Sequence, residues 1–100
     1  MRIISYRKLR EFFKEHPDSK TSLEAWYVAV ENADWKNFAD VRKTINNADV
    51  YRKCTVFDIG GNKYRLIAWV NYKTHAVYVR HILTHSDYDK DKWKANCGSG

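Results

Sequence analysis

The sequence has no hydrophobic run long enough to cross a membrane. No apolar run in its 100 residues approaches the length of ~18 consecutive residues that a membrane-spanning helix needs. The opening residues, MRIISYRKLR, also lack the continuous apolar segment of a secretory signal. One proline and four glycines, without repeats, exclude a collagen-like or low-complexity chain. We therefore expect no membrane association and a cytoplasmic location.

Cysteine is scarce as well. Cys54 and Cys97 are the two cysteines, and they do not form the CxxC spacing of zinc or redox motifs. We expect them to be reduced, as is usual in the cytosol.

The histidine and aspartate spacings also argue against a metal site. His81 and His85 would share a face only on a helix, whereas the alternating residues before them favour a strand. We interpret three alternating carboxylates as solvated charges: Asp87, Asp89 and Asp91. The sequence therefore predicts no metal site and no cofactor.

Apolar residues are plentiful enough for one compact domain. Hydrophobic residues make up 44% of the chain and aromatic residues 15%, well above the composition of disordered chains. A chain of about 100 residues rarely divides its core between two domains. We predict a single domain over residues 1–97, with residues 98–100 as a flexible tail or a cloning remnant.

The positive charge is concentrated in the second half of the chain. The net charge is +6, from 18 basic and 12 acidic residues. Residues 1–50 have nine basic against eight acidic residues, whereas residues 51–100 have nine against four. Three of the four histidines also lie in the second half. A positive field on one part of a small domain favours nucleic acids, acidic proteins or anionic membrane surfaces as partners, and composition alone does not choose among them.

Helical periodicity follows a short β-branched strand, RIIS, in the first half. Ser5 is placed to cap a helix that Pro17 ends. Thr21 and Glu24 have capping-box spacing, which predicts the start of a second helix. A third, weaker helical pattern lies within DWKNFADVRKTI.

The period changes to alternation after Asp49, which predicts an antiparallel meander. Gly60, Gly61 and Asn62 supply the residues that tolerate the positive φ angles of a tight hairpin turn. The expected fold class is α+β, with strands near residues 50–53, 54–59, 63–72 and 76–83.

Strict alternation divides the central hairpin into two faces. Tyr64, Leu66 and Ala68 should face the helices, while Lys63, Arg65 and Trp69 should lie on the opposite face. On the next strand, the same rule groups Arg80 with Tyr78 and Ile82 and predicts that Arg65 and Arg80 project from one side of the sheet. Two guanidinium groups would suit a phosphate, although a solvated or salt-bridged arginine is the commoner case.

The segments VYRKCTVFDIGGNKYRLIAWVNY and VYVRHILTHSDYDK together resemble the HigB family of bacterial toxins, within the RelE-like superfamily. The resemblance covers about half the chain, from Asp49 to Lys90, and its most specific parts are GGN, the following YRL, the strand-end arginine and THxxYDK. It implies a RelE-like α+β fold in which an N-terminal strand and two to three helices pack on a twisted antiparallel sheet.

The same resemblance implies an activity and partners. A member of this family is expected to be the toxin of a type II toxin-antitoxin system and a ribosome-dependent endoribonuclease that cleaves translated mRNA. Cleavage in the superfamily proceeds without a metal, by attack of the 2′-hydroxyl on the adjacent phosphate. The expected partners are a HigA-like helix-turn-helix antitoxin, mRNA and the ribosomal RNA.

The family motif also implies roles for particular residues. Arg65 and Arg80 would hold the phosphate, with support from Lys63, and His85 and Tyr88 would transfer protons or position the base. We favour His85 as the main proton carrier, because histidine titrates near pH 6.5. A second set would bind RNA: Arg52, Lys53, Asn62, Lys90 and Lys92.

Other interpretations remain open at this point. A ParE-like toxin without nuclease activity, or a plain RNA-binding domain, could use the same scaffold. His85 could cap the strand end, Tyr88 could anchor the C-terminal residues, and Asn62 could serve turn geometry alone. We expect Trp69 to lie under the C-terminal residues as part of the core rather than to act as a stacking platform.

Overall fold

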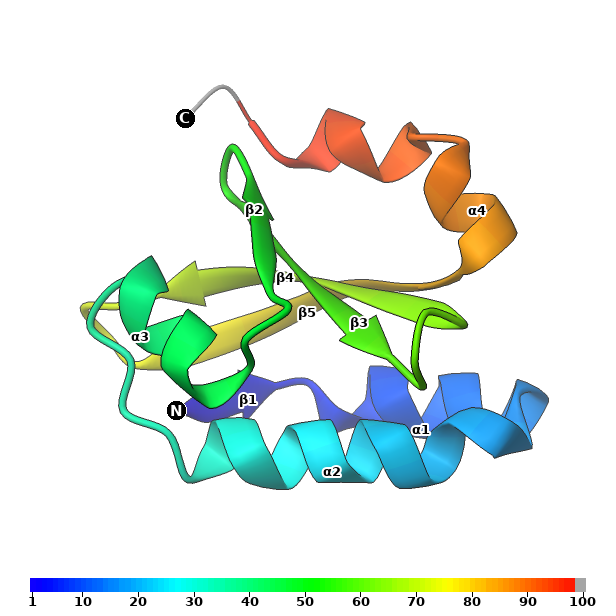
Figure 1. Cartoon of the computed structure of the whole chain (residues 1–100), viewed down its shortest axis with the longest axis horizontal. Coiled ribbons are helices and arrows are strands. Elements are labelled where there is room, and N and C mark those ends of the chain that lie inside the picture. The colour runs from blue at the N-terminus through cyan, green and yellow to red at the C-terminus, as the bar shows by residue number, and fades with distance from the viewer. Residues whose placement is uncertain (99–100) are drawn as a thin grey trace.

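The computed structural model describes residues 1–98 as helices on both sides of one sheet (Figure 1). The helices are α1 (Tyr6–Glu15), α2 (Lys20–Glu31), α3 (Phe38–Thr44) and α4 (His85–Asp89), with short 3-10 turns η1 (Pro17–Ser19) and η2 (Lys92–Asn96). The strands are β1 (Arg2–Ile4), β2 (Asp49–Tyr51), β3 (Cys54–Ile59), β4 (Tyr64–Asn71) and β5 (Ala76–Thr84). The predicted α+β class and all the predicted elements are confirmed. Of the predicted tail, Gly98 is described and exposed, and the rest lies outside the described residues.

The sheet is mixed rather than wholly antiparallel. Its strand order is β1-β5-β4-β3-β2, with β1 parallel to β5 and the other neighbours antiparallel. The predicted antiparallel meander is confirmed for β2 to β5, and β1 adds a parallel edge strand, because α1 and α2 intervene before the meander and return the chain to the far edge. The GGN turn joins β3 and β4 as predicted, with positive φ at Gly60, Gly61 and Asn62.

Helix α2 begins earlier than the capping-box pattern predicts. The turn η1 continues directly into α2 at Lys20, so Thr21 lies inside the helix and cannot cap it. Ser5 does occupy the N-cap position of α1, although its side chain makes no capping hydrogen bond. Pro17 ends α1 as expected, since α1 stops at Glu15.

The main core lies between the sheet and the layer formed by α1 and α2. Leu9, Leu23 and Val30 point from the helices into it and are fully buried. Leu66 and Ala68 meet them from β4, as the alternation predicts. Because successive side chains of a strand point to opposite faces, this packing leaves the other face of β4 for the layer on the far side of the sheet.

The opposite face of the sheet is partly covered by the C-terminal segment, residues 85–97. This segment, which contains α4 and η2, lies across the sheet from α1 and α2 (Figure 1). Trp93 anchors it in a second, smaller core with Val56 and Ile67. The tryptophan buried under this segment is therefore Trp93 of the segment itself, whereas Trp69 is 37% exposed. The expectation that Trp69 is part of the core is wrong.

A disulfide closes this second core. Cys54, at the start of β3, is bonded to Cys97, at the end of the C-terminal segment, and both are fully buried. The structure therefore differs from the expected pair of reduced thiols. Sequence spacing gives no sign of this pairing, because β3 and the C-terminal segment meet only in the folded chain. No helix within residues 1–98 combines the length and apolar character that a membrane crossing requires.

Candidate active site

Arg65 is a partly buried hub beside the β3–β4 turn. Its Nε lies 2.9 Å from Asp58 Oδ1, and only 11% of its side chain is exposed. Its Nη2 donates to Asn62 Oδ1 at 2.6 Å, and its Nη1 donates to the carbonyl oxygens of Asn62 and Tyr64. The β3–β4 register explains the ion pair, since Asp58 stands directly opposite Arg65. The contacts of Arg65 therefore fix the turn and partly neutralise its charge.

Tyr88 lies over this hub. The guanidinium carbon of Arg65 is 5.0 Å from the centre of the Tyr88 ring. The Tyr88 ring also stacks on Trp93, with centroids 5.2 Å apart and planes 10° from parallel. Arg65 and Trp93 thus hold Tyr88 in place, which supports the anchoring interpretation and leaves its hydroxyl available for a second role.

His85 begins α4 close to the same turn. Its backbone N–H donates to the carbonyl oxygen of Lys63 at 3.1 Å, which ties α4 to the start of β4. Its Nδ1 lies 3.0 Å from Asp89 Oδ2, and 52% of the side chain is exposed. Because Asp89 engages Nδ1, the neutral imidazole has Nε2 as an unprotonated acceptor. The structure therefore adds Asp89 to the predicted residues as the partner that orients His85.

Sequence reasoning missed Asp89 and Asp58 for different reasons. Asp89 lies four residues after His85, but this spacing has meaning only on a helix, and α4 is too short to show periodicity. Asp58 is the single charged residue in an otherwise apolar strand, CTVFDI. The GGN turn sets the β3–β4 register, and that register places Asp58 opposite Arg65. The geometry of the turn could therefore have predicted this partner of Arg65 from the sequence.

The ammonium group of Lys63 pairs with a carboxylate of the helical layer. Its Nζ lies 3.4 Å from Asp18 Oδ2, in the η1 turn of the helical layer. Asp18 also accepts a hydrogen bond from the Tyr64 hydroxyl at 2.6 Å. This bond lowers the pKa of Asp18 and raises the pKa of Tyr64. Among the predicted site residues, Lys63 therefore contributes its backbone carbonyl to the site, while its charge is paired elsewhere.

Arg80 contacts a different aromatic ring from Arg65. The β4–β5 register pairs Ile67 with His81 and Ala68 with Val79, so Arg80 is the extra residue of a β-bulge. The bulge breaks the alternation on which the predicted faces depended: Ile82 packs in the main core, and Leu83 stands opposite Arg65. The Arg80 guanidinium instead lies 4.3 Å from the centre of the Trp69 ring. The two guanidinium groups therefore bind different partners within residues 1–98.

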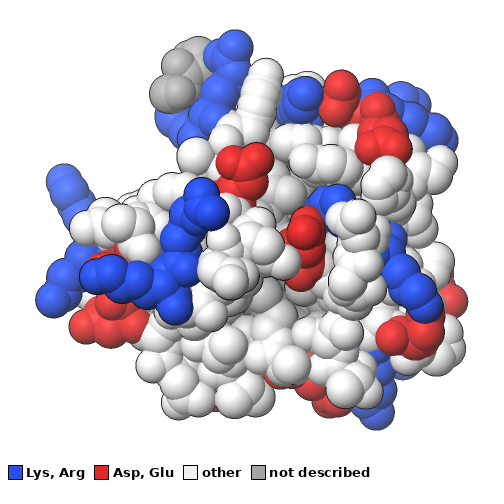
Figure 2. All heavy atoms as spheres, viewed as in Figure 1, with Lys and Arg blue, Asp and Glu red and all other residues white. Residues whose placement is uncertain are grey.

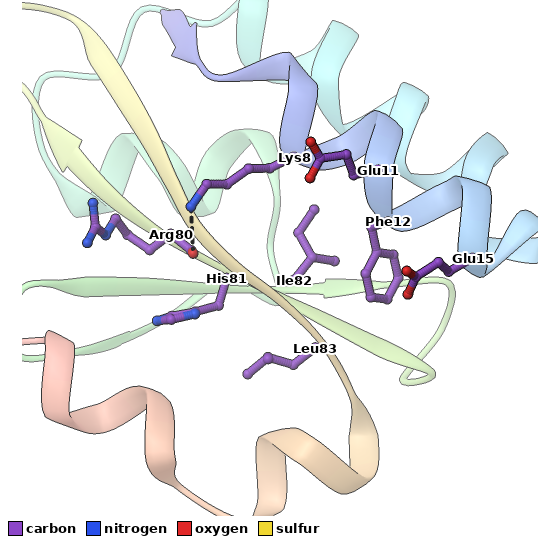
Figure 3. Close-up of a pocket in the computed structure, with 8 residues that line it drawn as sticks. All are labelled: Lys8, Glu11, Phe12, Glu15, Arg80, His81, Ile82 and Leu83. Carbon is purple, nitrogen blue, oxygen red and sulfur yellow. Dashed lines mark hydrogen bonds between the residues drawn. The ribbon is translucent and has the colours of Figure 1, made fainter.

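A shallow cavity of about 360 Å³ lies between α1 and β5 (Figure 3). It exists because β1 pairs with β5 only as far as Tyr78, and α1 continues beside the unpaired edge. Lys8 Nζ donates to the Arg80 carbonyl oxygen at 3.2 Å across this gap. The side chains of Arg80 and His81 point away from α1 (Figure 3), so this cavity does not gather the predicted site residues.

A second cavity of about 340 Å³ separates β5 from the C-terminal segment. Its polar lining includes His81, Asn96 and the predicted RNA-binding residues Lys90 and Lys92. The His81 Nε2 lies 3.0 Å from Asn96 Nδ2. Burial, with the nearby charges of Lys8 and Arg80, lowers the pKa of His81. His81 is therefore a neutral imidazole near neutral pH, and sequence reasoning considered it only as a metal ligand.

The remaining predicted RNA-binding residues lie at two places. Arg52 and Lys53 form the exposed β2–β3 turn, where the Lys53 N–H donates to the Cys97 carbonyl oxygen. Asn62 combines a positive φ angle with its bond to Arg65, so it serves the turn and the hub together. Figure 2 shows Lys and Arg side chains around the margin of one face, with carboxylates among them and a mostly uncharged centre.

The carboxylates of the C-terminal segment each have a basic neighbour. Asp87 pairs with Lys90, Asp89 with His85, and Asp91 with Lys94. Within residues 1–98 no group of three or more His, Cys, Asp or Glu side chains is arranged to hold a metal ion.

Comparison with known proteins places this α+β domain among the RelE-like toxic components of toxin-antitoxin systems. The model of the HigB toxin family, described in those terms, matches residues 19–91. The chain therefore belongs to the HigB toxin family. This result agrees with the resemblance seen in the sequence.

Curated relatives cover almost the whole chain. An mRNA interferase HigB from Escherichia coli O6:H1 is 31% identical over 93 residues, which are 90% of each chain. The mRNA interferase toxin HigB of Escherichia coli K12 and the mRNA interferase HigB of Shigella flexneri are each 27% identical over 92 residues, covering 89% of this chain and 88% of theirs.

The geometry defines a cluster of four residues at the turn end of the sheet: Arg65, His85, Tyr88 and Asp89. An oriented and exposed imidazole, an aromatic hydroxyl and a fixed cation are the kinds of groups that proton transfer at a phosphate requires. Arg80 is outside this cluster.

Proposed function

We propose that the protein is the toxin of a type II toxin-antitoxin system and that it cleaves mRNA at the cluster of Arg65, His85, Tyr88 and Asp89. The observation that carries the site is the His85–Asp89 pair, 3.0 Å apart, on a short helix whose Tyr88 lies over Arg65. The names of the curated relatives support mRNA as the substrate.

The proposed reaction is an intramolecular transesterification. His85 Nε2 accepts the proton of a 2′-hydroxyl, and the 2′ oxygen attacks the adjacent phosphorus. The bond from phosphorus to the 5′ oxygen then breaks, leaving a 2′,3′-cyclic phosphate. The departing 5′ oxygen takes a proton from water, and the His85 imidazolium gives its proton to the hydroxide that remains. Asp89 stabilises the imidazolium that forms, as an orienting carboxylate does in other histidine bases.

Tyr88 and Arg65 support this step differently from each other. The Tyr88 hydroxyl is the candidate that contacts the phosphate or the leaving oxygen. Arg65 is a positioning residue, because Asp58, Asn62 and two carbonyl oxygens already take up its N–H groups. Its partly neutralised charge still favours the anionic transition state at short range. We therefore propose one supporting arginine at the reaction, in place of the two that the sequence predicts on one phosphate.

The partners follow from the same proposal. A toxin needs an antitoxin, and we propose a HigA-like helix-turn-helix protein. We also propose that cleavage occurs on translated mRNA in the ribosome, and that exposed cations such as Arg52, Lys53 and Lys92 attract ribosomal RNA. Cytoplasmic action is part of this proposal.

The test is a primer-extension assay on translated mRNA with wild type and His85→Gln. The structure offers a matched control, because His75 is 49% exposed and its Nδ1 also lies 3.0 Å from a carboxylate, that of Asp34. We expect His85→Gln to reduce cleavage about 100-fold or more, as loss of a general base does, and His75→Gln to retain it. Equal cleavage by all three proteins would remove His85 from the mechanism, and no cleavage by wild type would overturn the activity.

A further inference from the structure

The largest cavity described lies at the other end of the sheet from the turn-end cluster. We define this notch as the opening of about 650 Å³ between the β2–β3 turn and the C-terminal end of β4. It forms because β4 is longer than its neighbour: the last β3–β4 pair is Cys54 with Trp69, and β4 continues to Asn71. The hairpin of β2 and β3 rises beside this end of the sheet (Figure 1).

Three aromatic residues line the notch, and one of them is exposed. Trp69 is 37% exposed, whereas the other three tryptophans are at most 5% exposed. Tyr78 stands directly opposite Trp69 across the β4–β5 pair, so both rings start from the same face of the sheet. Tyr72 borders the same notch. Neighbouring aromatic rings that the fold leaves in contact with solvent provide flat surfaces for another flat group.

The charged residues around these rings all have the same sign. Lys36, Arg52, Lys53 and Lys73 line the notch, and no Asp or Glu does. None of these four takes part in the ion pairs found within residues 1–98, unlike Lys63, Lys90 and Lys94. The charge of the notch is therefore complementary to an anionic ligand, and such a ligand can bind these cations without breaking ion pairs within the protein.

Arg80 lies against one of these rings. Its guanidinium stacks on Trp69 at 4.3 Å, and its Nε is buried without an acceptor among the described residues. A stacked arginine is held in one plane and can direct its outer N–H groups toward a phosphate. A base against Trp69 would place its own phosphate within reach of Arg80 and the flanking lysines.

We infer that the notch binds a nucleotide of single-stranded RNA, with its base against Trp69 and its phosphate near Arg80. Flat rings combined with unpaired cations and without carboxylates favour this ligand over an acidic peptide, which needs the cations but not the rings. The inference rests on the proposed function and extends it: the notch holds the RNA chain away from the scissile phosphate, so Arg80 serves binding and not the chemical step.

The test measures binding of the intact chain to a 2′-O-methyl adenosine octanucleotide, which lacks the nucleophilic hydroxyl and cannot be cleaved. Trp69 is the exposed tryptophan, so stacking should quench the intrinsic fluorescence of wild type. We expect Trp69→Ala to weaken binding about tenfold, in line with the loss of one stacked base. The matched control is Val28→Ala on α2, which removes an exposed apolar side chain (55%) far from the notch in sequence and should leave binding unchanged.

Charge is tested with a second pair of variants. Lys36→Glu with Lys73→Glu should weaken binding more than Lys14→Glu, which reverses an exposed charge on α1. Unchanged affinity in both notch variants would overturn the inference. So would a notch variant that keeps its RNA affinity but loses affinity for the antitoxin, because the notch would then be a protein-binding surface. His85→Gln separates the two proposals, since it should cleave poorly and still bind the octanucleotide like wild type.

Discussion

The guanidinium of Arg65 lies 5.0 Å from the centre of the Tyr88 ring, and this contact joins the β3–β4 turn to the C-terminal segment. The turn side of the contact is held by Asp58 and Asn62, and the other side by Trp93. A strand residue and a residue of the C-terminal segment thus form one unit, although 22 positions separate them in the sequence. Its stability decides how precisely His85 and Tyr88 are placed.

Arg65→Ala should destabilise the fold strongly. The substitution leaves Asp58 and Asn62 without their partner in a partly buried site, and we expect the free energy of unfolding to fall by about 3 kcal/mol. The matched control is Arg7→Ala, whose ion pair with Glu11 is exposed on both sides and should cost less than about 0.5 kcal/mol. Urea unfolding measures both values, and similar losses in the two variants would contradict the role of Arg65 as a hub.

Tyr88→Phe should separate the anchoring role of Tyr88 from its chemical role. The variant keeps the ring between Arg65 and Trp93, so the melting temperature should stay close to that of wild type. We expect mRNA cleavage to fall by about tenfold or more, because a hydroxyl near the phosphate is lost. Tyr51→Phe is the control, since Tyr51 contacts Trp93 edge to face but lies outside the cluster. Full activity of Tyr88→Phe would leave Tyr88 with a structural role alone.

Removing the disulfide should loosen the C-terminal segment. The bond between Cys54 and Cys97 spans a sequence separation of 43 residues. A loop of that length corresponds to about 4 kcal/mol of stabilisation in the chain-entropy treatment. We expect Cys54→Ser with Cys97→Ser to unfold at lower urea and to exchange amide hydrogens faster over residues 85–97.

A reductant provides the control for that experiment. Dithiothreitol should lower the stability of wild type toward that of the double serine variant and should have no further effect on the variant. An identical urea midpoint for wild type with and without reductant would argue against the disulfide as a stabilising link.

His81 should make stability depend on pH below neutrality. Burial, with help from Lys8 and Arg80, lowers its pKa in the fold, so the unfolded chain binds a proton more readily. The stability that neutral His81 contributes to the free energy of unfolding is therefore fully present above the ordinary pKa of about 6.5. It is lost as the pH falls from that value toward the lower pKa of the folded state. Lys90, Lys92 and Asp87 line the same cavity and modify the size of the effect.

The measurement compares wild type with His81→Gln by urea unfolding across this pH range. The difference in unfolding free energy between the two proteins should increase with pH up to about 6.5 and then level off. The other three histidines are present in both proteins, so their contributions cancel in the difference. A difference that does not change with pH would mean that the fold does not perturb His81.

Local patterns predicted most of the elements but not their partners. The periodicity of 3.6 residues located the helices, and the alternation after Asp49 located the strands, because both patterns depend on residues close in sequence. The same rules failed at His81 and Ile82, because the extra residue at Arg80 reverses the faces of β5 beyond it. They also failed for Trp69, since only packing decides which tryptophan is buried in the second core.

The sequence by itself determined the α+β class and the GGN hairpin, because these follow from short-range backbone preferences. It also predicts His85 and Tyr88 as site residues, from a contiguous family motif. Only the tertiary structure decided that Arg65 is paired with Asp58, that Asp89 orients His85, that Arg80 lies on Trp69 and that Cys54 is bonded to Cys97. Each of these contacts depends on strand register, a bulge or the path of the C-terminal segment. Those features are fixed by the packing of the whole chain, and no stretch of neighbouring residues encodes them.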